Sequence, residues 1–155
     1  MEEYTMTITA KDLMTSSVKV VQPNSTVEEA AKILLDNSIS GLPVVDEEGI
    51  LKGIISEGDL VFQNKKLSPP AMVDILGALI TVGSQEQYFK ELKRTLATTV
   101  NELMVTDVVT VNPDMTLEDI ATLMIEKKIN RVPVVDEQKL VGIITRQDII
   151  RATYK

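Results

Sequence analysis

Two short segments of the chain place a hydroxyl three residues before an aspartate, Ser56 before Asp59 and Thr145 before Asp148. One interpretation is a capping box, in which hydroxyl and carboxylate satisfy backbone N–H groups at the start of a helix. The other is a ligand site, because free N–H groups beside a hydroxyl suit a phosphate, and the aspartate could accept both hydroxyls of a ribose. The residues alone leave both interpretations open.

Three cations could strengthen a phosphate site near Thr145. Arg131 precedes an apolar run and offers a guanidinium that can clamp a phosphate with two hydrogen bonds. Lys19 interrupts another apolar run, and Arg146 directly follows Thr145, so both are further phosphate candidates. A solvated surface charge is the alternative for each of them.

The surroundings of the two aspartates differ in charge. Glu57 directly follows Ser56 and would repel a phosphate at that helix start, whereas the cations gather on the side of Asp148. We therefore expect the Asp148 site to bind more tightly. The formal net charge of −7 counts against a phosphorylated ligand and keeps a neutral or cationic one open.

Missing residue types argue against several chemistries. The chain has no histidine, which is the commonest general base and metal ligand, and no cysteine. We expect no catalytic residue, no metal site and no enzymatic activity. With 16 basic against 23 acidic residues, non-specific binding to nucleic acid or to a membrane surface is not expected. No run of 18 apolar residues exists, and residues 1–5 lack the apolar core of a signal sequence, so we expect a cytoplasmic protein.

The elements that would position these residues occur twice. Thr9–Asp46 aligns with Thr99–Asp136 at an offset of 90, with 14 of 38 positions identical. After a one-residue deletion in a turn, Leu51–Leu60 aligns with Leu140–Ile149 at an offset of 89. Each copy is too small for a good core, so we expect the copies to pack together about a pseudo-two-fold axis, with clefts between them.

Each copy predicts the order β-α-β-β-α after a short helical turn, which makes an α/β (α+β) fold. The two copies of the predicted elements are the turns 10–14 and 100–104, the strands 18–21 and 108–111, the helices after Thr26 and Thr116, the strands 42–45 and 132–135, the strands 50–55 and 140–144, and the helices that follow Ser56 and Thr145.

The predicted organisation is a first repeat over 1–63, a helical insert or linker over 64–98, and a second repeat over 99–155. In the insert, we expect Ala71–Val82 to form an apolar helix that covers the core of the module or contacts a partner. We expect Ser84–Thr98 to form a charged helix capped by Ser84. The role of the insert is left open.

The order, spacing and duplication of these motifs resemble the cystathionine-β-synthase (CBS) domain family. The resemblance rests on Met14-Thr15 with Val18, Ile39–Asp46 and Gly53–Asp59 in the first copy, and on Met104 with Val108, Ile129–Asp136 and Gly142–Asp148 in the second. It implies a tandem pair, or Bateman module, which in this family senses adenosine-containing ligands. This chain would be a free-standing example with AMP, ADP or ATP as its ligand and no required cofactor.

The resemblance also implies that both copies build each pocket. One site would contain Val18, Lys19, Ile39, Ser40, Gly41, Arg131, Thr145, Arg146 and Asp148. The second would contain Ser56, Asp59, Val108, Val109, Ile129 and Asn130. S-adenosylmethionine or a dinucleotide is the alternative ligand, and a ligand-free scaffold with its clefts filled by Met14, Met104 and Ile39 is the alternative function.

We expect the module to assemble as a homodimer. The apolar helix faces around Val27, Ala31 and Leu34, and their counterparts in the second copy, need to be covered, and a closed two-fold dimer is the commonest way to do so. Met72–Val82 would add apolar surface of the same kind. An unknown protein target is a further possible partner.

Overall fold

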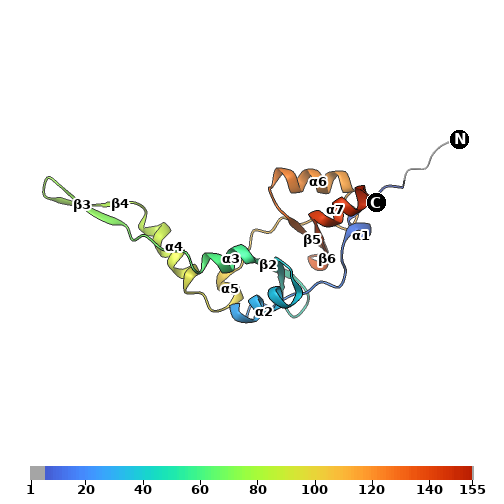
Figure 1. Ribbon diagram of the computed structural model, residues 1–155, viewed down its shortest axis with the longest axis horizontal. Coiled ribbons are helices and arrows are strands. Elements are labelled where there is room, and N and C mark those ends of the chain that lie inside the picture. Colours follow the sequence, from blue (N-terminus) through green and yellow to red (C-terminus); the bar gives the residue numbers. More distant parts are fainter. Residues whose placement is uncertain (1–5, 155) are drawn as a thin grey trace.

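The computed structural model describes residues 6–154 and consists of two lobes and a projecting arm (Figure 1). Residues 1–5, on which the expectation about a signal sequence rests, and residue 155 lie outside the described residues. Among the described residues, no helix combines the length and apolar character that crossing a membrane requires.

Each lobe is a two-stranded antiparallel sheet flanked by helices, as the repeat predicts. The first lobe contains α2 (Val27–Asn37), β1 (Gly41–Val45), β2 (Leu51–Ser56) and α3 (Glu57–Phe62), and the second contains α6 (Leu117–Glu126), β5 (Arg131–Asp136), β6 (Lys139–Thr145) and α7 (Arg146–Thr153). Threonines start the long helix in each lobe, since Thr26 Oγ1 accepts from Glu29 N at 3.0 Å and Thr116 Oγ1 from Asp119 N at 3.3 Å. The mixed α/β (α+β) fold predicted from the sequence is therefore confirmed.

The strand expected at the start of each repeat is only one residue long. Val21 and Val111 each form a single parallel bridge, to Val44 and Val134. Residues 18–20 and 108–110 make no bridge, and Pro23 and the equivalent Pro113 lack the N–H group that would extend the pairing beyond Val21 and Val111. The expected strands over 18–21 and 108–111 are therefore wrong in length.

The two short helices are exchanged between the lobes. Helix α1 (Ala10–Leu13) packs into the core of the second lobe, where Ala10 N donates to Met115 O at 2.8 Å. Helix α5 (Val100–Leu103) packs into the core of the first lobe, where Val100 N donates to Ser25 O at 2.9 Å. Each packed lobe therefore contains one short helix from the other sequence repeat, and the chain crosses between the lobes to place it there.

Two glycines allow this crossing. A Cβ atom at Gly53 would lie 2.8 Å from Met104 Sδ and 2.7 Å from the backbone oxygen of Val105, and one at Gly142 would lie 2.7 Å from Met14 Cγ. The methionine after each short helix therefore packs directly on the facing strand, where only glycine leaves room. This explains why glycine occupies both aligned positions.

The insert forms a hairpin, so the helix expected over Ala71–Val82 is wrong. Strands β3 (Ala71–Ile75) and β4 (Ala78–Val82) pair antiparallel around a turn at Leu76 (φ 52°) and Gly77 (φ 86°). Two consecutive positive φ angles make the two-residue turn typical of hairpins, and the β-branched residues on both sides favour strands over a helix.

The second part of the insert is the expected helix. Helix α4 (Gln85–Thr95) begins after Ser84, whose Oγ accepts from Gln87 N at 3.1 Å. The hairpin extends beyond α4 and points away from both lobes (Figure 1).

Candidate functional site

Among the described residues, three cavities are lined by both repeats, and two of them contain the predicted site residues. The larger of these two has a volume of about 500 Å³, within the roughly 300–1,000 Å³ usual for small-molecule sites, and the smaller has about 270 Å³. Both are lined by residues of both repeats, as the repeat architecture predicts. The larger cavity is therefore the stronger candidate for a binding site.

The larger cavity brings together eight of the nine residues predicted for the first site. They are Val18, Lys19, Ile39, Ser40, Gly41, Arg131, Thr145 and Arg146. Asp148 is the exception and does not line this cavity. Met14 and Met104 pack on glycines and line neither cavity, whereas Ile39 does line the larger one.

The smaller cavity contains all six residues predicted for the second site. They are Ser56, Asp59, Val108, Val109, Ile129 and Asn130. Asn130 and Arg131 line both cavities, so the segment that enters β5 separates the two sites. The predicted grouping of side chains is thus reproduced, while ligand binding by them remains a prediction.

Arg131 is the central cation of this region. Its guanidinium donates to Ser40 Oγ and lies so close above Gly41 that a Cβ atom there would be 2.7 Å from Arg131 Cζ. Burial lowers the pKa of Arg131, Glu57 and Asp59 act in the opposite direction, and Arg146 lowers it further. An arginine stays protonated at neutral pH in spite of such shifts. A half-buried positive charge is thus held between the two lobes.

Glu57 lines the larger cavity, whereas the sequence analysis placed it beside Asp59, which lines the smaller one. We expected it to weaken the Asp59 site, but it lines the larger cavity, where its backbone N–H donates to Ser40 O at 2.9 Å. Glu57 thus faces the larger cavity, although its chain neighbour Ser56 lines the smaller one. The larger cavity therefore contains Lys19, Arg131 and Arg146 together with one carboxylate.

Asp148 caps helix α7. Its Oδ2 accepts from Thr145 N at 2.7 Å and from Thr145 Oγ1 at 3.1 Å, which confirms the capping interpretation. Its Oδ1 accepts from Arg151 Nη1 at 3.2 Å, and the Arg151 side chain is 65% exposed. Oδ1 is therefore held only by a solvated arginine of the same helix.

Asp59 caps α3 in the same way but has a different second partner. Its Oδ2 accepts from Ser56 N at 2.9 Å, and its Oδ1 accepts from Arg94 Nη2 at 2.8 Å. Arg94 belongs to α4, and its guanidinium stacks 4.1 Å from the centre of the Phe62 ring. The insert thus closes over this aspartate, which the repeat alignment could not show because the insert lies outside it.

No cluster of acidic side chains suited to a metal ion occurs within residues 6–154.

The geometry agrees with what comparison with known proteins finds. A family model described as "CBS domain" matches residues 10–64 and 100–155, the two repeats without most of the insert. The chain belongs to the CBS domain family. The resemblance inferred from the motifs is confirmed, and the CBS pair accounts for everything except the hairpin and α4.

Similar proteins share the whole pair. Protein MJ1426 of Methanocaldococcus jannaschii is 37% identical over 150 residues, which cover 92% of this chain and 89% of that protein. The crystal structure of CBSX2 in complex with AMP superposes with a TM-score of 0.74 at 31% identity, covering 94% of this chain and 96% of CBSX2. The CBS domain pair of protein MJ0100, in complex with 5′-methylthioadenosine and S-adenosyl-L-methionine, superposes with a TM-score of 0.69 at 28% identity, covering 96% of this chain and 97% of that pair.

Proposed function

We propose that the chain is a non-catalytic regulatory sensor that binds an adenine nucleotide in the larger cavity between its lobes. The observation that carries the proposal is the convergence of Lys19, Arg131 and Arg146 on the cavity that also contains Thr145 at the start of α7. Three cations and a hydroxyl at a helix start make a site for phosphate oxygens. AMP bound to CBSX2, a protein of the same fold, supports an adenine nucleotide as the ligand.

The remaining parts of the ligand fit other walls of the cavity. Val18 and Ile39 provide an apolar slot for the base. Asp148 does not line the cavity, but it caps the helix that begins after Thr145, so we assign the ribose hydroxyls to its Oδ1, where they would replace the solvated guanidinium of Arg151. Oδ2 would stay bonded to Thr145 and keep α7 in place.

S-adenosylmethionine is the second candidate, and Glu57 is the observation that favours it. A carboxylate in the larger cavity can pair with a sulfonium or ammonium group, which a nucleotide lacks. The bound ligands of the MJ0100 pair point in the same direction. We rank the nucleotide first because three cations outnumber one acid.

Regulation would follow from the position of the site. A ligand that touches both lobes binds one arrangement of them better than another and shifts the population toward it. Val27 and Leu34, around which the apolar dimer face was predicted, are buried in the core of the first lobe. We still propose a homodimer, because other apolar side chains on the helices are 55–78% exposed, namely Leu35, Val61, Ile125 and Ile150. Light scattering at micromolar concentration should give twice the chain mass, and a monomer would contradict the dimer.

Calorimetry with AMP, ADP, ATP, S-adenosylmethionine and a dinucleotide tests the ligand. We expect the adenine nucleotides to bind and, at about 100 times the dissociation constant, to stabilise the protein by roughly 2.7 kcal/mol. Binding of S-adenosylmethionine without any nucleotide would overturn the phosphate assignment. Binding of none of these compounds would favour the scaffold function, and hydrolysis of bound nucleotide over hours would indicate an enzyme.

A further inference from the structure

The insert supplies Asp59 with a guanidinium that the second lobe supplies from its own helix. At the 89-residue offset of the repeats, Phe62 of α3 corresponds to Arg151 of α7. Arg151 donates to the second oxygen of Asp148 at 3.2 Å. Phe62 instead offers an aromatic ring, on which the Arg94 guanidinium stacks at 4.1 Å from the ring centre. Arg94 then donates to Asp59 Oδ1 at 2.8 Å, so a helix outside the repeats makes the equivalent charge pair.

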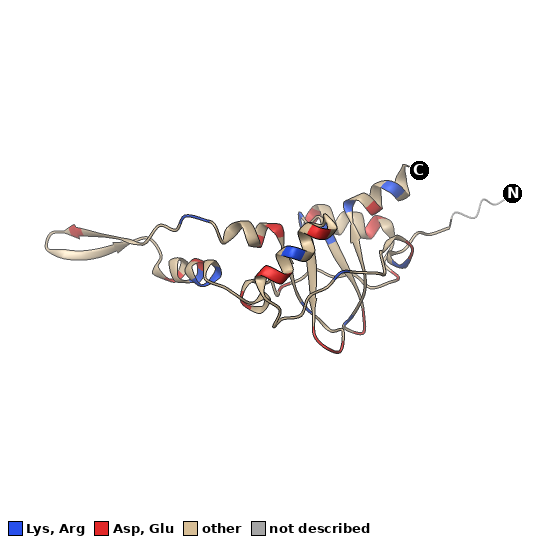
Figure 2. Cartoon of the chain, turned by 60° about the horizontal axis from the view of Figure 1, so that its bottom comes forward, with Lys and Arg blue, Asp and Glu red and all other residues tan. Residues whose placement is uncertain are grey.

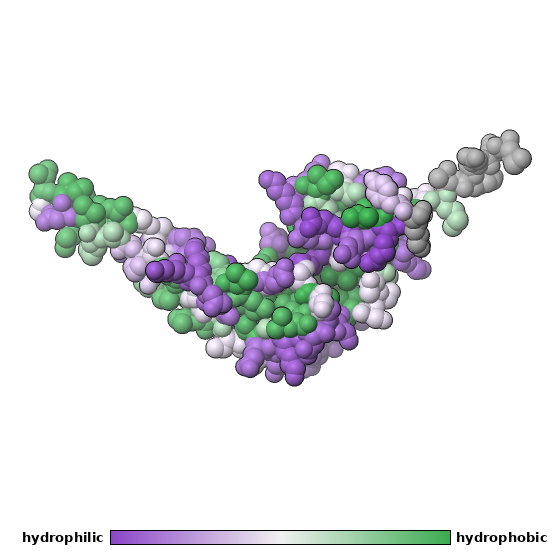
Figure 3. Space-filling model, in the orientation of Figure 1, coloured by the Kyte–Doolittle hydropathy of each residue, from purple (hydrophilic) through white to green (hydrophobic). Residues whose placement is uncertain are grey.

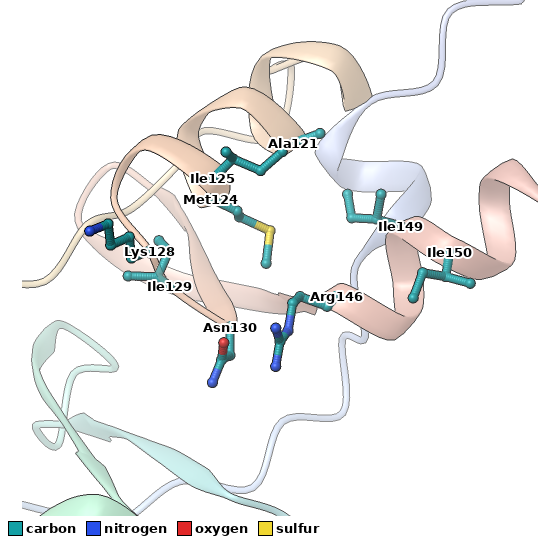
Figure 4. Close-up of a pocket in the computed structure, with 9 residues that line it drawn as sticks. All are labelled: Ala121, Met124, Ile125, Lys128, Ile129, Asn130, Arg146, Ile149 and Ile150. Atoms are coloured by element: carbon teal, nitrogen blue, oxygen red, sulfur yellow. The ribbon is translucent and has the colours of Figure 1, made fainter.

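Helix α7 makes this pair without help from another element. Arg151 bonds within α7, to Asp148 and to Gln147, and its side chain is 65% exposed. Among the described residues, those that line the hollow of about 470 Å³ between α6 and α7 all belong to the second repeat (Figure 4). Moving Arg151 away from Asp148 therefore changes contacts of α7 alone, whereas moving Arg94 away from Asp59 removes a contact between α4 and the first lobe.

Polar contacts hold α4 on the first lobe. Helix α4, which the structure describes in full, has no buried residue. It carries charges of both signs (Figure 2), and hydrophilic residues over it separate the apolar end of the hairpin from the first lobe (Figure 3). Besides the Arg94 pair, Lys65 Nζ lies 2.8 Å from Glu91 Oε1. Gln63 Nε2 donates to the backbone oxygens of Arg94 and Ala97 at 3.2 and 2.9 Å. An isolated helix of this length is marginal in water, so these contacts keep α4 ordered.

The second oxygen of Asp59 needs a partner in every state of the protein. Asp59 is only 7% exposed, and an unpartnered buried carboxylate oxygen is costly. Oδ2 is bonded to Ser56 N and Ser56 Oγ as the cap of α3. Oδ1 is therefore the oxygen for which the Arg94 guanidinium and the hydroxyls of a ribose in the smaller cavity would compete.

We propose that Arg94 is a latch, which occupies the place of a ribose on Asp59, so that an adenosine ligand in the smaller cavity and a docked α4 exclude each other. The inference rests on the proposed nucleotide binding and extends it to the second site. A ligand that takes Oδ1 frees Arg94 and loosens α4. Because linkage is reciprocal, a docked α4 weakens the smaller site, which is then the second to fill.

The latch gives the hairpin a connection to the ligand. Gln63 binds backbone oxygens at the C-terminal end of α4, so this end stays attached when the Arg94 side chain leaves. At the other end of α4, residues 83 and 84 alone separate it from strand β4 (Figure 1). Loosening α4 therefore changes the direction in which the hairpin projects, and only when the second site is filled.

Hydrogen exchange measured by mass spectrometry tests the latch in the full-length protein without ligand. Arg94→Met breaks the pair and keeps an apolar side chain on Phe62. The amides of α4 should then exchange about three- to tenfold faster, because their exchange follows the local opening of this helix. Lys93→Met is the matched control, since it removes an exposed charge from the same helix and should exchange like the wild type. Equal exchange in the two variants would overturn the latch.

Titration with AMP, followed by calorimetry and hydrogen exchange, tests the competition. We expect α4 of the wild type to keep its protection while the first site fills and to lose it as a second, weaker AMP binds. In Arg94→Met the second event should occur at a few-fold lower concentration and should leave α4 exchange unchanged. S-adenosylmethionine carries the same ribose, so a parallel titration shows whether the effect depends on the phosphate.

The contrary outcomes separate the latch from the proposed function. Two bound AMP molecules with α4 still protected would overturn the latch. One bound AMP in both the wild type and Arg94→Met would overturn the latch and the second site, while the larger cavity stands as the nucleotide site. Loss of α4 protection with S-adenosylmethionine alone would keep the latch and overturn the phosphate assignment. Binding of neither compound would overturn the proposed function and the latch together.

Discussion

Asp59 and Asp148 occupy aligned positions and cap their helices with the same bonds, but they differ in what holds the second carboxylate oxygen. At Asp148 it is Arg151, a solvated residue of the same helix at 3.2 Å. At Asp59 it is Arg94, a half-buried residue of the insert at 2.8 Å. The two repeats form two similar caps. The insert makes them different, because it supplies Arg94 to Asp59 and has no counterpart at Asp148.

The comparison suggests a division of labour. The larger cavity between the lobes is large enough for a nucleotide, and the aspartate of the second lobe has only a solvent-exposed arginine on its second oxygen. The smaller cavity also lies between the lobes, and the aspartate of the first lobe that lines it is bonded to Arg94 of α4 in the insert. We infer that binding is concentrated at one site and that the other contributes mainly to structure.

The largest effect is expected at Arg131, which lines both cavities. Arg131→Met removes charge-assisted bonds of about 1.5–3 kcal/mol, so AMP affinity should fall roughly 10- to 100-fold in calorimetry. Lys127→Met, which removes an exposed charge outside both cavities, is the matched control. Unchanged affinity in Arg131→Met would show that the cavity between the lobes is not the nucleotide site.

The next effect concerns the two aspartates directly. Asp148→Ala should weaken AMP at least about tenfold, because a carboxylate that accepts ribose hydroxyls is lost, and Asp59→Ala should cost less. Both variants lose a helix cap, so each affinity is measured well below the melting temperature of that variant. Equal losses of AMP affinity in the two variants would contradict the proposal that the Asp148 site binds more tightly.

Stability should differ between the two crossing glycines. Gly53→Ala places a methyl group 2.7 Å from the fixed backbone oxygen of Val105, whereas the atoms nearest to a methyl group in Gly142→Ala belong to the Met14 side chain, including its Cβ at 2.8 Å. Overpacking costs about 1–3 kcal/mol, so we expect Gly53→Ala to be the less stable by about 1 kcal/mol. Urea unfolding of the two variants measures this difference, and the reverse order would mean that the Met14 side is the more rigid.

The smallest effect is expected for Arg94. Arg94→Ala frees Asp59 Oδ1, so a weak second binding event, a few-fold stronger than in the wild type, should appear at high AMP concentration. Arg151→Ala is the control, since it frees the equivalent oxygen of Asp148 without touching the insert. Calorimetry that gives one site in both variants would show that Arg94 does not restrict the smaller cavity.

Much of the CBS pair could be predicted from its sequence, because each helix start and each strand motif occurs twice and each copy supports the assignment of the other. Thr26 and Thr116 mark the same helix start in both copies, and the eight predicted residues that line the larger cavity come from motifs that occur twice. Asp148 does not line that cavity, and its spacing from Thr145 could not distinguish a helix cap from a ribose site, because both need the same residues. The geometry of Oδ1 and Oδ2 separates them, and spacing does not.

Two of the misjudged features, the hairpin and the contact of Arg94, lie in the insert, for which the duplication gives no second copy. Leu76-Gly77 between β-branched residues is typical of a hairpin, but the apolar character of Ala71–Val82 also suits a buried helix. The structure leaves this segment exposed, so no core surface is available to bury such a helix. Glu57 was assigned to the wrong cavity because spacing along one strand does not tell which lobe its end faces. The contact between Arg94 and Asp59 depends on the path of the insert, which no local pattern specifies.

The exchange of α1 and α5 also determines how the molecule comes apart. Each core is completed by a helix from the other half, so opening either lobe exposes apolar residues in both. The two lobes should therefore melt in one cooperative transition, and residues 1–63 or 99–155 expressed alone should lack a finished core. Two separate halves could regain it by pairing, which is the arrangement that a single ancestral repeat would have needed before its gene was duplicated.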